Sequence, residues 1–252
     1  MLGREGIGGF VNYRIIKKAL ARFRHTPLHP QWFVYRGEKD KHAGVASWVK
    51  GRVLDIGCAD GVIKRSLAQG VSYIGLDYYA TAMNWYNTKP DIFGDAHMLP
   101  IASASVDSVL LLDVLEHLHN PKLCVQEVVR VLKPGGVFYV QVPFIYPEHD
   151  APLDYHRWTK YGMRKLVSEY HLAICVEKSF GKPIETAVLL FNIALAKSML
   201  TWFRKRSPAL IFAPVVPIAI FLANLFGYAF AMLNLDDDMM AHGHCLVLRK
   251  QA

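Results

Sequence analysis

Two acidic residues lie at the ends of neighbouring apolar runs, and a glycine-bearing turn separates them. The stretch "VLDIGCADGV" (53–62) carries Asp55 in its apolar run and Gly57 and Gly61 in its turn, and a second run, 72–77, ends in Asp77. A strand, a glycine turn and a helix start let backbone N–H groups approach a bound nucleotide closely. An acid about 20 residues further on accepts hydrogen bonds from ribose hydroxyls. These residues predict a site for a dinucleotide or another adenosine cofactor.

Several histidines follow in positions where a general base would be useful. His117 and His119 lie in "EHLHN", and His149 and His156 lie in the stretch 147–159, "PEHDAPLDYHRWT". Histidine is the side chain that most readily accepts a proton near neutral pH. His117 is at most two turns from Asp113, so we expect it to face the cleft. The alternative is that each histidine has only a structural role.

The stretch 147–159 is also rich in groups that contact polar ligands. Arg157 is a candidate to grip a phosphate or carboxylate, and Tyr155 and Trp158 are candidates to stack on a sugar or isoprenoid. The alternative is that the two aromatic residues anchor the helix that follows. The spacing of His149, Asp150, Asp154 and His156 matches no standard metal site, so we expect no metal.

Strand-like and helix-like segments alternate from residue 52 onward. We expect strands at 52–57, 72–77, 91–96, 106–113 and 136–143, and helices at 121–132 and 159–170. Two more strands are expected at about 172–180 and at 242–250, "HGHCLVLRK". This alternation predicts an α/β fold, a Rossmann-like doubly wound sheet that is mostly parallel. Its ligands belong at the carboxyl ends of the strands.

The chain resembles the class I S-adenosylmethionine-dependent methyltransferases of the small-molecule type. The resemblance is carried by "VLDIGCADG", "IGLDYY", "GDAHMLPIASASVDSVLLLDVLEHLHNP" and "LKPGGVFYVQVP", and it covers roughly residues 45–180. It implies an antiparallel last strand. "DYHRWT" is similar to stretches in bacterial methyltransferases of polysaccharide and glycolipid pathways. One departure is that Ala59 takes the middle place of a turn that often reads G-x-G-x-G.

The resemblance implies S-adenosyl-L-methionine as cofactor and gives roles to individual residues. The methionine end would be lined by Asp55, Gly57, Cys58 and Gly61, with Asp113 facing its amino-acid group. Asp77 would hold the ribose. Tyr78, Asp95 and Ala96 would meet the adenine.

Composition narrows the class of protein. The 252 residues are 52% hydrophobic and 20% charged, which is typical of a globular protein. The net charge is +8, and residues 1–50 hold ten Lys or Arg against three acids. This basic front favours an anionic partner, with a lipid surface ranked above nucleic acid. The four cysteines are far apart, so we expect them reduced in the cytoplasm.

Two apolar segments, 184–203 and 209–233, lie between the last two expected strands. A single membrane span at 209–233 would leave the last strand on the wrong side of the bilayer. Two spans would place Arg204–Arg206 outside, against the positive-inside preference. We therefore expect a hairpin lying in one leaflet, helped by a basic amphipathic helix at 10–24. The alternatives are a lid and a dimer contact.

These observations predict four parts: residues 1–44, a cofactor-binding core at 45–183, an apolar helical insertion at 184–235, and a last strand at 236–252. The predicted function is methylation of a small amphipathic acceptor, at a hydroxyl of a lipid-linked sugar or lipid precursor. Two other hypotheses stay open: a nicotinamide-dependent oxidoreductase and a non-catalytic, membrane-docked adaptor that keeps the fold. The oligomeric state is left open.

Overall fold

The computed structural model describes residues 21–233 and 237–251. The predicted amphipathic helix at 10–24 lies outside these residues, apart from its last four positions. The chain divides into two compact units. One combines Met1–Glu38 with Gly181–Met240, and the other combines Lys39–Phe180 with Ala241–Ala252.

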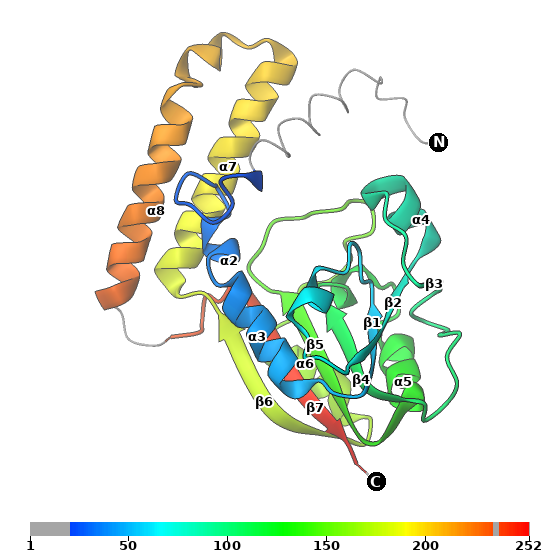
Figure 1. Cartoon of the computed structure of the whole chain (residues 1–252). Helices are drawn as coiled ribbons and strands as arrows, with labels where there is room; N and C mark the ends of the chain where they lie inside the picture. Colours follow the sequence, from blue (N-terminus) through cyan, green and yellow to red (C-terminus); the bar gives the residue numbers. More distant parts are fainter. Residues whose placement is uncertain (1–20, 234–236, 252) are drawn as a thin grey trace. The chain divides into compact units, whose positions relative to one another are not determined.

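The larger unit is built on a seven-stranded sheet in the order β3-β2-β1-β4-β5-β7-β6 (Figure 1). The strands are β1 (Arg52–Ile56), β2 (Ser72–Asp77), β3 (Ile92–Phe93), β4 (Val106–Leu112), β5 (Leu132–Pro143), β6 (Leu172–Phe180) and β7 (Gly243–Lys250). The first five pair in parallel. The last strand, β7, runs antiparallel between β5 and β6. This confirms the predicted Rossmann-like sheet and its antiparallel last strand.

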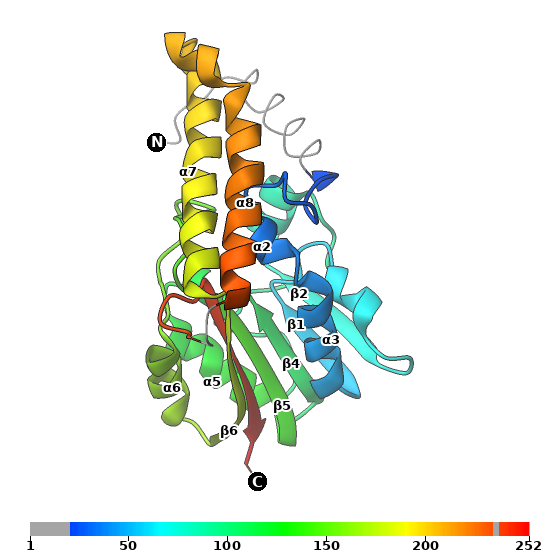
Figure 2. The same cartoon turned by 90° about the vertical axis from the view of Figure 1, so that its left-hand side faces the viewer.

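Helices cover both faces of this sheet. Figure 2 shows α3 (Glu38–Trp48) on one side, with α5 (Pro121–Val131) and α6 (Lys160–Ser168) on the other. Val53, Leu110 and Val137 pack toward the α3 side, while Leu54, Val109 and Phe138 pack toward α5 and α6. Burial on both faces explains why β4 reads as an almost continuous apolar run.

The helix starts and stops follow local chemistry. Asn120 caps α5 by accepting the Leu123 amide, and Pro121 takes its first position. Thr159 caps α6 by accepting the Gly162 amide. The sequence predicted the start of a helix after the turn at 57–61. The structure has a five-residue 3₁₀ helix there, η1 (Val62–Ser66), and not an α-helix. The cofactor turn therefore has no long helix behind it.

The smaller unit is a hairpin of α7 (Pro183–Lys205) and α8 (Val215–Leu233), which lie side by side in both views (Figures 1 and 2). The short segments η4 (Pro208–Phe212) and α2 (Trp32–Tyr35) complete it. Inside the pair, Asn192 donates to Asn224, which donates in turn to the carbonyls of Pro27 and His29. Both helices are long and apolar enough to cross a membrane, by length and composition only.

Candidate active site

Acidic side chains follow or end three strands, β2, β3 and β4, at the carboxyl edge of the sheet, where β1 lies between β2 and β4. Asp77 is the last residue of β2, Asp95 follows β3, and Asp113 follows β4. In a doubly wound sheet this edge is where ligands bind. The strand order therefore brings together three residues that lie far apart in the sequence.

The turn after β1 is held by Asp77. The Asp77 carboxylate accepts the Ala59 amide at 2.9 Å and the Tyr78 amide at 2.7 Å. Gly57, Ala59 and Gly61 all have positive φ, of +73°, +46° and +62°. A Cβ on Gly57 would lie 2.4 Å from Val114, so glycine is required there. Asp77, which is predicted to hold the ribose, thus also shapes the turn after β1.

Asp55 lies in β1, just before this turn, and Cys58 lies within the turn. Asp55 is 3% exposed and accepts the Tyr73 hydroxyl at 2.6 Å. Burial raises the pKa of Asp55 to about 7, with a further contribution from Asp77 and an opposing one from the Tyr73 hydrogen bond. Burial, followed by the nearby acids, raises the pKa of the Cys58 thiol to about 12. Cys58 is therefore a neutral thiol rather than a nucleophile.

The residues expected at the adenine differ in exposure. Tyr78 is 53% exposed, whereas Ala96 is buried. Asp95 accepts the His97 amide at 2.8 Å and contacts its imidazole at 2.6 Å. Burial alone would raise the pKa of Asp95, but the His97 hydrogen bonds outweigh it and lower the pKa. Asp95 therefore presents an ionised acceptor.

Asp113 follows β4 with a φ of +55°. Its carboxylate accepts the side-chain amide of Gln141 at 2.9 Å, and its own amide donates to the Gln141 carbonyl. Gln141 lies on β5, so Asp113 is held from the neighbouring strand. Gln141 has no signal in the sequence other than its place near the end of β5.

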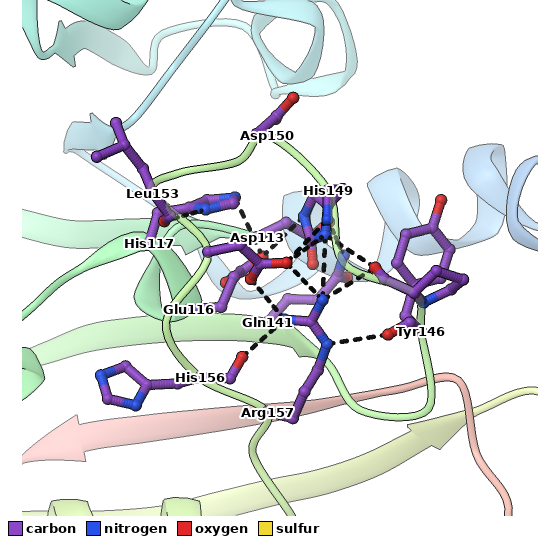
Figure 3. A network of polar contacts seen from close by, with 12 residues as sticks. Asp113, Glu116, His117, Gln141, Tyr146, His149, Asp150, Leu153, His156 and Arg157 are labelled. Carbon is purple, nitrogen blue, oxygen red and sulfur yellow. Dashed lines mark hydrogen bonds and ion pairs between the residues drawn. The ribbon is translucent and has the colours of Figure 1, made fainter. Parts of the chain in front are cut away.

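His117 and His149 converge, as Figure 3 shows, with their ring centroids 4.9 Å apart. Each Nε2 lies 3.8 Å from Oε1 of Glu116. Glu116 is 0% exposed, and neither of its carboxylate oxygens has a hydrogen-bond partner. Burial, and then Asp113, raise the pKa of Glu116 well above its ordinary value. Glu116 was not predicted from the sequence, although it stands next to His117 in "LEHL".

Arg157 is occupied within its own loop. Its guanidinium donates to both oxygens of Asp154 at 2.6 Å and to the carbonyls of Tyr146, Pro147 and His156 (Figure 3). Burial would raise the pKa of Asp154, but the Arg157 bonds and the His149 amide lower it to about 2. These contacts favour a structural role, so anion binding by Arg157 stays a prediction.

The other predicted residues of the loop, His156, Trp158 and Tyr155, differ in whether they can reach an acceptor. The His156 ring points away from the Glu116 cluster (Figure 3), and Trp158 packs against the core, as an anchoring residue would. Tyr155 is 48% exposed. It lines an open hollow of about 300 Å³ together with Tyr146, Glu148, Asp154, His156 and Arg157. Tyr155 is therefore the better placed of the two aromatic residues to meet an acceptor.

Residues 54–140 match the family model described as "Methyltransferase domain". The match contains the turn after β1 and the acids that end β2, β3 and β4. The domain belongs to the class I S-adenosylmethionine-dependent methyltransferases.

Individual relatives agree with this family. A "Probable S-adenosylmethionine-dependent methyltransferase" from Mycolicibacterium smegmatis is 38% identical over 110 residues, covering 40% of this chain and 43% of that protein. The sterol 24-C-methyltransferase of Yarrowia lipolytica is 26% identical over 172 residues, covering 64% of this chain and 43% of that protein. The fatty-acid O-methyltransferase of M. smegmatis is 28% identical over 168 residues, covering 63% of this chain and 60% of that protein. The chain thus spans less than half the length of the first two relatives.

Solved structures share the fold. A Bacillus halodurans protein assigned to the methyltransferases has a TM-score of 0.52 at 18% identity, covering 86% of this chain and all of that chain. The cyclase SpnF has the same TM-score and identity, and the match covers 85% of this chain and 80% of that chain. Because one of the two is a cyclase, the fold alone does not decide the reaction.

The cofactor of this methyltransferase family is S-adenosyl-L-methionine, and the site has the chemistry to hold it. This cofactor carries an ammonium, a sulfonium and two ribose hydroxyls. Asp77, Asp95 and Asp113 place carboxylates, which suit such donors and cations, at the carboxyl ends of β2, β3 and β4. Within the described residues, a Cβ on Gly61 would meet only the Tyr73 hydroxyl, at 3.5 Å, so the space there is open. Gly61 therefore lets a ligand approach the backbone closely. When bound, the cofactor supplies an activated methyl group.

Proposed function

We propose that this methyltransferase transfers a methyl group from S-adenosyl-L-methionine to a hydroxyl of a small amphipathic acceptor, a lipid-linked sugar or lipid precursor. We further propose that it works at the cytoplasmic face of a membrane, with its apolar hairpin lying in one leaflet. The observation that carries the proposal is the second apolar face of α8.

One face of α8 is buried against its own unit, at Val216, Ile220, Asn224, Gly227 and Ala231. The opposite face is also apolar and is 41–59% exposed at Val215, Ile218, Leu222, Leu225 and Phe226. A helix that is apolar all round needs a nonpolar medium on the side that its own unit does not cover. Large exposed apolar patches mark membrane or protein contacts.

Charge at the hairpin supports a leaflet rather than a second protein. Arg204 and Lys205 end α7 and Arg206 caps it. The next segment, η4, carries Ile211 and Phe212, which are 77% and 60% exposed. Basic residues beside exposed apolar residues suit the boundary between headgroups and acyl chains. The sterol and fatty-acid methyltransferases among the relatives are named for apolar substrates, which favours an acceptor of the same solubility.

Methyl transfer from a sulfonium needs little covalent catalysis by the protein, because the methyl group is already activated. The displacement must be in line, so positioning and exclusion of water contribute most. A hydroxyl acceptor must lose its proton. His117 and His149 are the predicted bases that converge near Asp113, whereas the ring of His156 turns away. We propose that the acceptor hydroxyl reaches this pair past Tyr155.

Calorimetry with S-adenosylhomocysteine tests the cofactor site. We expect the wild-type protein to bind it and Asp77→Ala to bind at least 10-fold more weakly. The substitution removes the carboxylate proposed to accept the ribose hydroxyls, and it removes the hydrogen bond from the Ala59 amide. Glu169→Ala, on an exposed ion pair with Lys122, is the control. Undiminished binding by Asp77→Ala would count against the site.

Membrane docking is tested by flotation with anionic phospholipid vesicles. We expect the wild type to float and Ile218→Glu/Leu222→Glu to stay in the pellet. Ile174→Glu, at an exposed position on β6, is the matched control and should still float. Equal flotation of all three proteins would rule out α8 as the docking face.

The acceptor itself is sought by incubating the enzyme with methyl-labelled cofactor and a membrane lipid extract. A labelled product in the organic phase identifies the acceptor. Tight binding of the cofactor with no labelled product from any extract would favour the adaptor hypothesis. Binding of a nicotinamide cofactor in its place would favour the oxidoreductase.

A further inference from the structure

Glu116, His117 and His149 offer three ligand atoms that all lie within 4.8 Å of one another. This cluster adjoins Asp113 at the carboxyl edge of the sheet. The two Nε2–Oε1 separations are 3.8 Å. Ligands of one divalent ion lie about 2.0–2.2 Å from it, so two of them stand roughly 3–4 Å apart. The cluster therefore has the dimensions of a metal site.

Glu116 provides an independent reason for a cation. Its side chain is fully buried, and both oxygens lack any hydrogen-bond partner. Buried carboxylates are normally paired, hydrogen-bonded or bound to metal. Its oxygen Oε1 faces the two imidazoles, at 3.8 Å from Nε2 of each (Figure 3).

Both histidines turn the correct nitrogen toward Glu116. Nδ1 of His117 donates to the Leu153 carbonyl at 2.9 Å, which leaves the Nε2 lone pair free. Nδ1 of His149 lies 3.3 Å from two acceptors, the Pro147 carbonyl and the Asp154 carboxylate. Arg157 also lies 3.3 Å from this Nδ1, and it donates to the same two acceptors. The His117 bond is of the kind that orients a metal-binding imidazole. At His149 the same arrangement requires Nδ1 to carry the proton and donate to one of its two acceptors, rather than accept from Arg157.

The two segments that carry the ligands are joined before any ion arrives. The Glu116 carbonyl accepts the amides of Tyr155 at 2.9 Å and His156 at 3.2 Å. His117 reaches Leu153 of the same loop. A site that is already assembled loses little free energy to ordering when it binds.

We infer that Glu116, His117 and His149 form a divalent transition-metal site that binds the hydroxyl oxygen of the methyl acceptor. Two imidazoles and one carboxylate are a zinc-like set, and nitrogen ligands favour such ions over Mg²⁺. Three protein ligands leave a position open for an acceptor oxygen. This inference rests on the proposed function for its substrate, but not for the binding of the ion.

The ion would assist the reaction as a Lewis acid. The acceptor O–H bond breaks, its proton passes to water, and the oxygen forms a bond to the methyl carbon as the carbon–sulfur bond of the cofactor breaks. The sulfonium charge is lost and one proton is released, so charge balances. His117 and His149 would then act as ligands rather than as free bases.

The test is calorimetry of the full chain with Zn²⁺, repeated with Mg²⁺, and the visible absorption spectrum with Co²⁺. We expect one Zn²⁺ per chain, no comparable Mg²⁺ binding, and a Co²⁺ spectrum of a four- or five-coordinate site. Glu116→Gln keeps the side-chain shape and should weaken Zn²⁺ binding at least 10-fold, as should His149→Ala. His171→Ala, at an exposed histidine, is the control and should bind normally.

Absence of Zn²⁺ binding by the wild type, or equal binding by Glu116→Gln, His149→Ala and His171→Ala, would overturn the inference. Equal binding would place the ion elsewhere, for example on a half-buried or exposed cysteine. Binding of S-adenosylhomocysteine measured on the same samples keeps the two proposals apart. Cofactor binding without the metal would remove only this inference, and metal binding without the cofactor would remove only the proposed function.

Discussion

The backbone amide of Ala59 donates to the carboxylate of Asp77 across 2.9 Å, and Ala59 makes this bond with a φ of +46°. The first residue stands in the turn after β1, and the second ends β2. The hydrogen bond therefore holds an alanine in a backbone conformation that glycine adopts more readily. The turn after β1 and Asp77, the residue predicted to hold the ribose, are parts of one arrangement.

Ala59→Gly should stabilise the protein slightly. The left-handed region costs a residue with a Cβ about 1–2 kcal/mol, which glycine avoids. Glycine also raises the entropy of the unfolded chain, and this offsets about 0.4–1 kcal/mol of the gain. We expect the free energy of unfolding in urea to rise by up to about 1 kcal/mol.

Ala104→Gly is the matched control, because Ala104 has a φ of +48° in the loop before β4. It should stabilise the protein to a similar degree and leave S-adenosylhomocysteine affinity unchanged. A loss of stability in Ala59→Gly would show that the turn gains nothing from glycine at this position.

The buried carboxyl of Asp55 should make stability depend on pH. Its pKa is raised from 3.8 to about 7 in the folded protein. The folded state therefore keeps a proton that the unfolded state releases, and stability falls as pH rises from about 4 through about 7. Asp55→Asn lacks this titration, so relative to wild type it should gain up to about 4 kcal/mol between pH 4 and pH 8.

Urea unfolding of both proteins across this pH range measures the difference. Asp60→Asn removes an exposed carboxylate from the same turn and serves as the control. A difference between Asp55→Asn and wild type that stays constant with pH would contradict a raised pKa.

Arg157→Lys should loosen the loop at 144–158. Lysine keeps the charge, but its single nitrogen cannot replace a guanidinium that spans Asp154 and three carbonyls. We expect a local loss of about 1–3 kcal/mol, seen as faster proteolysis within the loop. Arg164→Lys, on the exposed pair with Glu177, should not change the rate. Unchanged proteolysis with weaker acceptor binding would instead support the predicted anion grip.

Asn224→Leu should destabilise the hairpin. The Asn224 amide donates to the Pro27 and His29 carbonyls, and its oxygen accepts from Asn192. Leucine of similar size would leave these buried groups unpaired, at about 1–3 kcal/mol each. Hydrogen exchange of the α8 amides should accelerate. Leu222→Ala, on the exposed face of α8, should leave the exchange of neighbouring amides nearly unchanged.

The sequence by itself determined the sheet and the acids at its edge. Apolar runs such as 106–113 report burial on both faces, and Asp77 and Asp113 were located simply by ending such runs. The place of the last strand followed from the family resemblance, and the pairing of β7 with β5 and β6 confirms it. These features are local in the chain, so a linear pattern can carry them.

Only the tertiary structure decided which polar side chains meet. Glu116 and His149 are 33 positions apart, and nothing in their spacing shows that they converge or that Glu116 is buried without a partner. Arg157 looked free to bind an anion, yet the loop folds so that Asp154 and three carbonyls use its donors. Such contacts depend on how a loop closes, and hydrophobic periodicity holds no information about that.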